Sequence, residues 1–257
     1  MVKVFKVKAK NIFTPTKIPE CAYSVNQYVG CQYACLYCYA RFLCKWKRYG
    51  EWGSWVEVKV NAPDLVRNRF VYGRVCMSTI SDPYQPLEEK LMLTRRILEN
   101  MHKGIRLSIL TKSDLVIRDI DILKKFSNVE VGLTVNGFQG REKEVFEPYS
   151  PPHARRIRAL EELYDSGIKT YCFISPVIPK LVDVNRIIDE LKELVSYFMV
   201  EFINFRAAGK GFINALKNMY PRSYEILTDK EAFIDYVGEV IENVEGVRAR
   251  FIFHKPK

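Results

Sequence analysis

The sequence predicts an α/β fold in which parallel strands alternate with helices. Six short segments rich in apolar and β-branched residues have the length of buried strands, and segments with helical periodicity separate them. The predicted strands span residues 22–29, 75–80, 105–110, 129–135, 170–177 and 199–205. Consecutive β–α units imply right-handed crossovers between parallel strands. Such strands either close partly into a barrel or form an open doubly wound sheet, and periodicity alone is compatible with both.

The predicted helices are marked by apolar residues at helical spacing. Three groups of such residues are Leu87, Leu91, Leu98 and Met101; Ile157, Leu160 and Leu163; and Ile187, Ile188, Leu191, Leu194 and Val195. Gly167 is expected to end the second helix. Asp114 is a suitable N-cap for a further helix through Ile120 and Leu123, because its carboxylate can accept from the free N–H groups of the first turn.

The pattern changes after Ala207. Residues 220–227 are expected to be irregular, residues 230–243 helical, and residues 247–253 a final strand. Arg248 and Arg250 alternate with apolar residues, as on a half-exposed edge strand. The chain shows no internal repeat, low-complexity tract or linker. We therefore expect one domain over residues 1–257, with a core of about 20–207 and a short α/β extension of about 208–257.

Composition limits the location and the partners. Hydrophobic residues make up 48% of the 257 residues and the net charge is +10. A basic surface favours polyanions such as nucleic acid, although it also fits a merely soluble or thermophile-like surface. Neither a signal peptide nor an apolar run of 18 residues is present, so no membrane association is expected. Seven cysteines in such a chain indicate a reducing cytoplasm, where clustered thiols bind metal more often than they form disulfides.

Three of the cysteines form a cluster directly after the first predicted strand. Cys31, Cys35 and Cys38 are separated by three and then two residues, whereas the other four stand singly, at Cys21, Cys44, Cys76 and Cys172. Structural zinc sites usually take four ligands in two pairs, and no second pair exists here. An iron–sulfur cubane held by three cysteines instead leaves one iron open. We favour the iron–sulfur cluster, with zinc as the alternative.

The cluster motif, with Tyr37 before its last cysteine, resembles that of the radical S-adenosylmethionine (SAM) enzymes. Further stretches resemble the spore photoproduct lyase-like branch, often labelled DNA repair photolyases, over about residues 11–183. They are SVNQYVGCQYACLYCYAR, TISDPYQPLEEKLMLTRRILE, LTKSDLVIRDIDIL, FEPYSPPHARRIRALEELYDSGIKT and SPVIPKLVD. The chain departs from the branch at Gln27, where proline is usual, and at Ala34, where glycine is usual. Neither position is a ligand.

The resemblance implies a fold and a chemistry. The fold is a TIM-barrel-like partial (β/α)6 barrel of parallel strands. Cys31, Cys35 and Cys38 would hold a 4Fe–4S cluster whose open iron is chelated by SAM. An electron, from a donor such as ferredoxin or flavodoxin, would cleave SAM to methionine and a 5′-deoxyadenosyl radical that abstracts a substrate hydrogen. The cofactors carry this chemistry, and the protein positions and shields them.

The resemblance also implies residues that contact SAM at the carboxyl ends of the strands, where such folds place their sites. Tyr37 would lie beside the adenine, Ser81 and Asp82 would bind the methionine amino group, and Lys112 and Thr134 would bind its carboxylate. Turn formation at Asp82 and a solvated Lys112 are the structural alternatives. Weaker candidates for contacts with ribose or substrate are Asn136, Asn204 and Arg206.

The substrate is the least defined part of the prediction. The related lyases return a hydrogen atom from a cysteine that aligns with Thr79, whose hydroxyl is a poor hydrogen-atom donor. Cys76 lies three residues away, and strand alternation predicts that it faces the opposite side as a core residue. A thymine-dimer reaction is therefore not expected. The basic charge favours a nucleic acid, DNA or tRNA. A small-molecule or protein substrate, or a non-enzymatic zinc protein that binds nucleic acid, are the alternatives.

Overall fold

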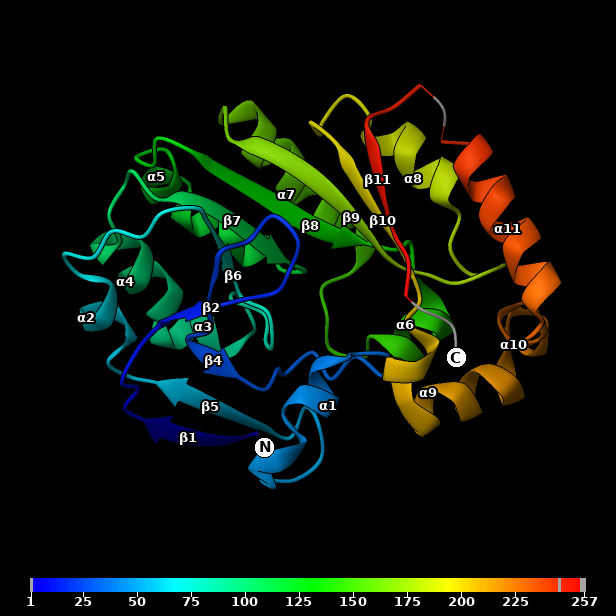
Figure 1. The fold of residues 1–257 in the computed structure, drawn as a ribbon, viewed down its shortest axis with the longest axis horizontal. Coiled ribbons are helices and arrows are strands. Elements are labelled where there is room, and N and C mark those ends of the chain that lie inside the picture. Colours follow the sequence, from blue (N-terminus) through cyan, green and yellow to red (C-terminus); the bar gives the residue numbers. More distant parts are fainter. Residues whose placement is uncertain (1, 245, 255–257) are drawn as a thin grey trace.

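The computed structural model describes residues 2–244 and 246–254, and its main feature is a curved eight-stranded sheet (Figure 1). The strand order is β11-β10-β9-β8-β7-β6-β3-β2, and every neighbouring pair is parallel except β2 with β3. The strands are β2 (Phe13–Pro15), β3 (Tyr23–Val25), β6 (Arg74–Met77), β7 (Arg106–Thr111), β8 (Val129–Val135), β9 (Lys169–Val177), β10 (Phe198–Phe202) and β11 (Ala249–Ile252). The predicted parallel α/β fold is confirmed, and the curved sheet is a partial barrel.

A second, three-stranded sheet has the order β1-β5-β4. It consists of β1 (Lys3–Val7), β5 (Trp55–Lys59) and β4 (Tyr28–Val29). The predicted strand over residues 22–29 is thus split between the two sheets. Asn26 and Gln27 lie at the crossing point, and their side chains bind Thr79 and Thr94 instead of continuing a strand.

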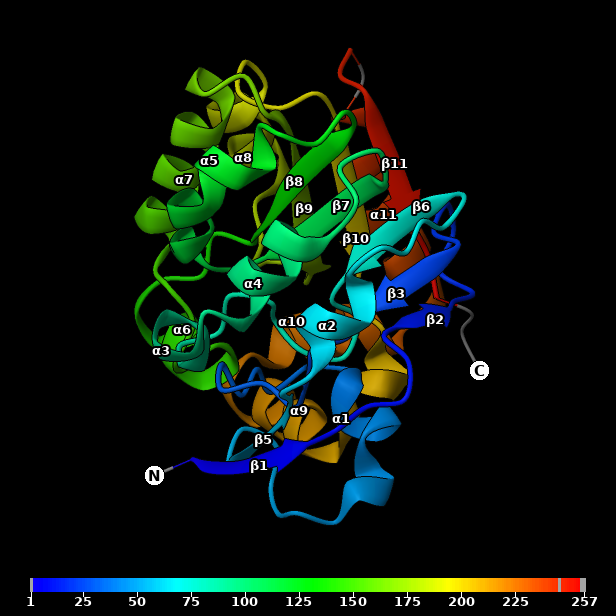
Figure 2. The same cartoon turned by 90° about the vertical axis from the view of Figure 1, so that its left-hand side faces the viewer.

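Helices cover one face of the large sheet, as Figure 2 shows. They are α4 (Leu93–Asn100), α5 (Ile120–Leu123), α7 (His153–Asp165) and α8 (Val184–Leu191). Alternate strand residues such as Val131 and Leu133 are fully buried in the same core as Leu160 and Ile187. The residues between them point to the other, concave face, which is polar.

Two details of the helices differ from the prediction. The first predicted helix is divided at Met92, which has a left-handed φ of 48°, into α3 (Leu87–Leu91) and α4. Ser113, not Asp114, caps the next helical segment, η2 (Asp114–Asp119), by accepting a hydrogen bond from the amide of Leu115. The carboxylate of Asp114 is instead engaged by Arg155, 2.6 Å away.

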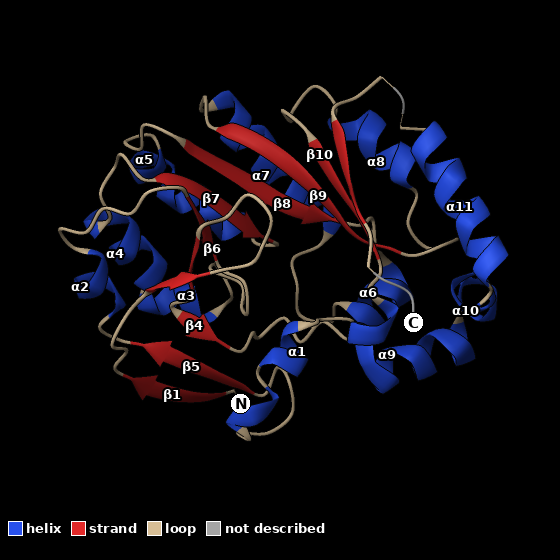
Figure 3. Ribbon diagram, viewed as in Figure 1, coloured by secondary structure: helices blue, strands red, loops and turns tan. Residues whose placement is uncertain are grey.

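The chain after β10 is mostly helical (Figure 3). It forms α9 (Phe205–Met219), α10 (Pro221–Thr228) and α11 (Lys230–Glu242) before β11. The prediction of an irregular segment at 220–227 is wrong, because Pro221 sits in the first turn of α10, where its missing N–H costs nothing. The predicted edge strand is confirmed as β11. The remaining short helices are α1 (Ala40–Leu43), η1 (Lys45–Lys47), α2 (Ala62–Val66) and α6 (Gly140–Phe146). Within the described residues, none of the helices has the length and apolarity to cross a membrane.

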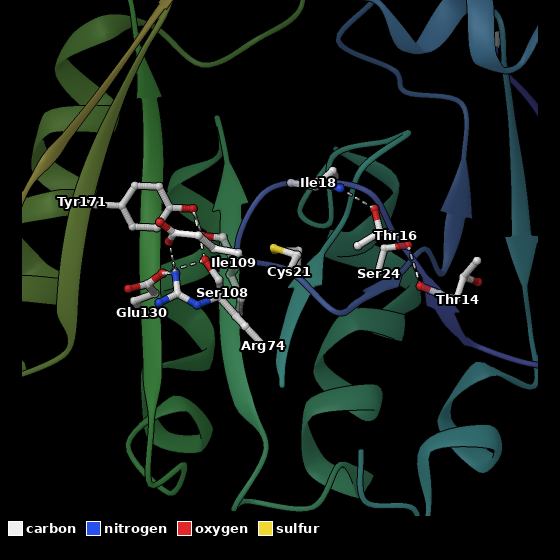
Figure 4. The surroundings of a disulfide bond; sticks show 12 residues. Thr14, Thr16, Ile18, Cys21, Ser24, Arg74, Ser108, Ile109, Glu130 and Tyr171 are labelled. Atoms are coloured by element: carbon white, nitrogen blue, oxygen red, sulfur yellow. Dashed lines mark hydrogen bonds and ion pairs between the residues drawn. A yellow bond between two sulfur atoms is a disulfide. The ribbon is translucent and has the colours of Figure 1, made fainter. Parts of the chain in front are cut away.

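The amino-terminal half of the concave face is filled by a polar layer (Figure 4). Glu130 is buried and accepts hydrogen bonds from Arg74 (2.6 Å), Ser108 (3.0 Å) and Tyr197 (3.1 Å). The ring of Tyr171 covers Gly132, where a Cβ would lie 2.2 Å from that ring. Arg74, Ser108 and Glu130 stand near the starts of β6, β7 and β8, so this layer lies toward the amino-terminal end of the barrel.

Cys21 and Cys76 form a disulfide beside this layer, with their Cα atoms 6.0 Å apart. This finding joins two of the cysteines that stand singly in the sequence, and it corrects the expectation that Cys76 is a core residue. Cys76 is half-buried and pairs in register with Ser24 and Ser108 on the concave face. The prediction for Cys76 assumed that side chains alternate regularly between the two faces as far as Thr79. The regular strand β6 ends at Met77, so this alternation does not reach Thr79.

Candidate active site at the carboxyl end of the barrel

The cysteine motif forms a compact loop between β4 and α1. Cys31 and Cys35 are buried, Cys38 is half-buried, and all three belong to one packed group with Tyr33, Tyr37 and Trp52. Two turns shape the loop, with the amide of Ala34 donating to the carbonyl of Cys31 and that of Cys38 to Cys35. The sequence expectation that these cysteines gather in one place therefore agrees with the structure.

The loop needs unusual backbone geometry at Ala34. Its φ is 53°, in the left-handed region that favours glycine, which explains why the related branch usually has glycine there. The neighbouring segment approaches so closely that a Cβ on Gly53 would lie 2.3 Å from the Cβ of Ala34. The absence of a side chain at Gly53 thus allows the 50–54 segment to pack against the cysteine loop.

The electrostatics of the three thiols fit a cationic group. Burial, followed by the negative charge of Asp82, raises the pKa of Cys31 well above its usual value. Burial raises the pKa of Cys35 to about 12. Burial also raises the pKa of Cys38. Thiolates here would be unfavourable without a positive partner, whereas coordination by metal deprotonates a thiol outright.

A buried donor lies in the same group. The indole N–H of Trp52 has no hydrogen-bond partner among the described residues, although it is excluded from solvent. Such a donor fits a sulfide-rich cluster, whose sulfurs accept hydrogen bonds. In a cubane each cysteine binds a different iron, so the ligands need not meet at one point. Across residues 2–244 and 246–254, no three His, Cys, Asp or Glu side chains surround a single ion position.

The predicted SAM-contacting residues of the second strand lie just past its end. Asp82 is buried, and its carboxylate accepts hydrogen bonds from the amides of Tyr84 (2.9 Å) and Lys112 (2.8 Å) and from the hydroxyl of Thr111 (2.6 Å). Ser81 donates to the carbonyl of Tyr28. Asp82 therefore takes part in a turn, which is the structural alternative given for it above. Its carboxylate also holds the end of β7.

Lys112 and Tyr37 lie together beside the cysteines. The Lys112 ammonium is 5.7 Å from the centre of the Tyr37 ring and 3.9 Å from the carboxylate of Glu147. Burial lowers the pKa of Lys112, but the negative charges of Cys35 and then Glu147 outweigh it, so the net pKa is raised. Lys112 is thus a mostly buried cation, and the alternative of a solvated side chain does not hold. Thr134 is buried at the end of β8, as expected.

Sequence reasoning assigned no role to Glu147 and Arg156, which form a buried ion pair at this site. Glu147 accepts hydrogen bonds from Tyr37, from Asn136 (2.7 Å) and from Ser150 (2.8 Å). The Arg156 guanidinium also donates to the carbonyl of Thr134, 2.9 Å away. The pair thereby ties Tyr37, Lys112, Asn136 and Thr134 into one network. The only sequence signal was the motif resemblance around FEP and HARR.

Of the weaker candidates, Asn136 belongs to this network, whereas Asn204 and Arg206 lie at the start of α9. Asn204 is the N-cap of α9, and Arg206 is exposed in its first turn. Tyr39, which follows Cys38, donates to the carbonyl of Thr79, 2.6 Å away. Arg206 contacts none of the other predicted site residues in the described structure, whereas Asn204 belongs to a separate polar group near β10.

A curved parallel sheet with a three-cysteine loop at its carboxyl edge defines a radical SAM enzyme. The family model described as Radical SAM superfamily matches residues 25–205, and the chain belongs to that superfamily. An uncharacterised protein of Methanocaldococcus jannaschii is 53% identical over 244 residues, covering 95% of this chain and 94% of that protein. A protein of Mycobacterium tuberculosis is 30% identical over 194 residues, covering 68% of this chain and 56% of that protein.

The fold is also shared with solved structures of spore photoproduct lyase. A single-substitution mutant of that lyase superposes with a TM-score of 0.66 at 16% identity, covering 98% of this chain and 82% of the lyase. A doubly substituted mutant with bound AdoMet and dinucleoside spore photoproduct gives a TM-score of 0.64 at 17% identity, with the same coverage. The expected partial barrel is confirmed. As a radical SAM enzyme, the protein uses a 4Fe–4S cluster and SAM.

Proposed function

We propose that Cys31, Cys35 and Cys38 hold the 4Fe–4S cluster and that the neighbouring network binds SAM. The observation that carries this proposal is the packing of the three thiols with Tyr37 and the Trp52 indole, next to the buried cation of Lys112. Bound SAM would supply the 5′-deoxyadenosyl radical.

The chain's own residues would bind and orient SAM. Lys112 is a mostly buried cation beside the Tyr37 ring, and its ammonium would bind the methionine carboxylate. The hydroxyl of Thr134 would donate to the same carboxylate. Tyr37 offers a face to the adenine while Glu147 holds its hydroxyl. Asp82, with its oxygens already accepting three hydrogen bonds, can still accept from the methionine ammonium, because an ionised carboxylate has about four acceptor positions. Ser81 lies next to it.

Anaerobic reconstitution tests the cluster and cofactor assignment. We expect iron and sulfide to bind, and reduction in the presence of SAM to release 5′-deoxyadenosine. Cys35→Ala is expected to abolish both, whereas Cys44→Ala, which removes a buried thiol outside the motif, should abolish neither. A colourless protein that takes up one zinc and no sulfide would contradict the proposal.

The proposed substrate is a nucleic acid, DNA or tRNA. The net charge of +10 supports this choice, as does the lyase of the same fold that was solved with a dinucleoside photoproduct. A surface beside the cysteine loop combines exposed Phe42 and Trp46 with exposed Lys45 and Arg48, the composition of a stacking platform for single strands. Thr79 supplies no thiol, so we do not expect the lyase reaction on a thymine dimer. A small molecule or a protein is the second candidate.

Salt-dependent binding tests the substrate class. We expect the protein to bind fluorescent single-stranded DNA or tRNA at 50 mM salt and to lose affinity steeply by 200 mM, because bound phosphates release counterions. Absence of binding to both at low salt would count against a nucleic acid and leave the small-molecule and protein candidates.

The remaining parts of the proposal concern organisation and setting. We place the enzyme in the cytoplasm, with ferredoxin or flavodoxin as the electron donor. We regard residues 1–257 as one domain, because β11 of the extension pairs with β10 of the core.

A further inference from the structure

A second polar group lies at the carboxyl ends of β9 and β10, apart from the cofactor network. Glu201 accepts a hydrogen bond from the Ser175 hydroxyl at 2.5 Å. Its other oxygen lies 2.9 Å from Nε2 of His254, and Nδ1 of His254 lies 3.2 Å from the amide nitrogen of Asn204. Ser175 lies two residues after Phe173, the register partner of Thr134, and therefore faces the concave side, and its hydrogen bond to Glu201 places that carboxylate on the same side.

The hydrogen-bond pattern orients the ring of His254. Asn204 caps α9 by accepting from the amide of Ala207 with its side-chain oxygen, at 3.0 Å. Its amide nitrogen therefore faces His254, and that nitrogen can only donate. Nδ1 of His254 therefore faces the Asn204 amide, and Nε2, on the other side of the ring, faces Glu201.

Glu201 differs from the other acidic side chains of the concave face. Glu130 and Glu147 are buried and pair with Arg or Lys, whereas the described residues place no Lys or Arg within 4 Å of the Glu201 carboxylate. The Glu201 side chain is 22% exposed. A carboxylate has about four acceptor positions, of which two are used here. Glu201 thus offers free acceptor capacity at the open end of the barrel.

Its position suits a substrate rather than SAM. The proposed SAM residues lie in the cysteine loop, just after β6 and β7, and at the end of β8, whereas Ser175 and Glu201 belong to β9 and β10. The opening is therefore divided into a cofactor side and a second side that Glu201 occupies.

We propose that Glu201, held by Ser175 and His254, recognises the substrate by accepting hydrogen bonds from its N–H groups. This inference rests on the proposed function, which makes the substrate a nucleic acid. In a nucleic acid the donors are the amino or imino groups on the edge of an unpaired base. A phosphate would be repelled by the carboxylate. The strand would thus present a base to Glu201 and its phosphates to the rim, where Arg206 and Lys210 are exposed on α9.

Three nine-unit strands with identical phosphates test this assignment. Each consists of abasic units, with a central guanine, a central N3-methylthymine, which has no N–H donor, or no base. Fluorescence anisotropy at 100 mM salt should show that the reconstituted wild-type protein prefers guanine over N3-methylthymine about tenfold, as expected for a hydrogen bond to a charged group.

The variants separate recognition from charge and from folding. Glu201→Gln should reduce the preference to less than twofold while the salt slope stays unchanged, and Ser175→Ala should reduce it in part. Glu193→Gln is an equal charge change just after α8, near the amino-terminal ends of β9 and β10, and it should leave the preference intact. Melting curves check folding. An unchanged preference in folded Glu201→Gln would overturn the recognition role alone. Failure of the wild type to bind any strand at low salt would overturn the nucleic-acid function and this assignment with it.

Discussion

The carboxylate of Glu147 and the guanidinium of Arg156 form an ion pair that is almost completely removed from solvent, with exposures of 0% and 3%. Ions at such depth are costly unless their partners and hydrogen bonds are all in place. Here Tyr37, Asn136 and Ser150 complete the set around Glu147. The pair therefore fixes the geometry of the residues that we propose for SAM binding.

The first prediction concerns acid stability. Burial alone would raise the pKa of Glu147, but Arg156, Lys112 and the hydrogen bonds together lower it from 4.5 to about 2. A lowered carboxyl pKa stabilises the fold above the unfolded pKa and loses that contribution as pH falls through the folded value. We expect about 3 kcal/mol of stability to be lost between pH 4.5 and pH 2. Urea unfolding at several pH values measures it.

The second prediction concerns removal of the charge. Glu147→Gln leaves Arg156 and Lys112 without their partner, and we expect a loss of about 3 to 5 kcal/mol. The acid-dependent part of the stability should disappear in the same variant. Glu144→Gln, an exposed position on α6, is the matched control and should change neither quantity. Equal stability of the two variants would contradict the role given to the pair.

The sequence predicted the repeating part of this structure well. Strand β8 matches its expected bounds, 129–135, because a buried parallel strand is a continuous apolar run with a clear beginning and end. The cysteine loop was equally clear, since spacing alone determined it. The split of residues 22–29 between two sheets was missed, because it depends on hydrogen bonds from Asn26 and Gln27 to residues more than 50 positions away.

Contacts between residues of different elements explain the other misses. Glu147 with Arg156 is visible only once β8, α6 and α7 are placed around the cysteine loop. Cys21 and Cys76 are 55 residues apart, and nothing in their local sequence indicates a disulfide. Periodicity reports which face of an element is buried, but it does not report which polar residues of different elements meet.

The third prediction concerns the strained turn of the cysteine loop. Ala34 has a φ of 53°, which costs a residue with a Cβ about 1 kcal/mol relative to glycine. We expect Ala34→Gly to raise the melting temperature by about 2 °C, with cluster content unchanged. Gly53→Ala is the opposite case, since its Cβ would meet Ala34, and it should lower both stability and iron content. A destabilised Ala34→Gly variant would argue against strain at this turn.

The fourth prediction concerns the indole of Trp52. A hydrogen bond to a cluster sulfur favours the reduced, more negative state, so its loss lowers the reduction potential. If the bond is worth about 1 kcal/mol, Trp52→Phe should shift the midpoint by about 40 mV to a more negative value. Redox titration followed by electron paramagnetic resonance measures the shift. Trp46→Phe, at an exposed position, is the control. An unchanged midpoint in Trp52→Phe would mean that the indole does not donate to the cluster.

The fifth prediction concerns the disulfide between Cys21 and Cys76. The bond joins the segment before β3 to β6 and closes a loop of 55 residues in sequence separation. Restricting the unfolded chain in this way stabilises the fold by about 4 kcal/mol in the loop-entropy description. Reduction should therefore lower the melting temperature by about 8 °C. The Cys21→Ser/Cys76→Ser double variant should melt at the lower temperature and respond to reductant no further. If the reductant shifts wild type and double variant equally, the shift comes from the other thiols and the disulfide does not stabilise the barrel.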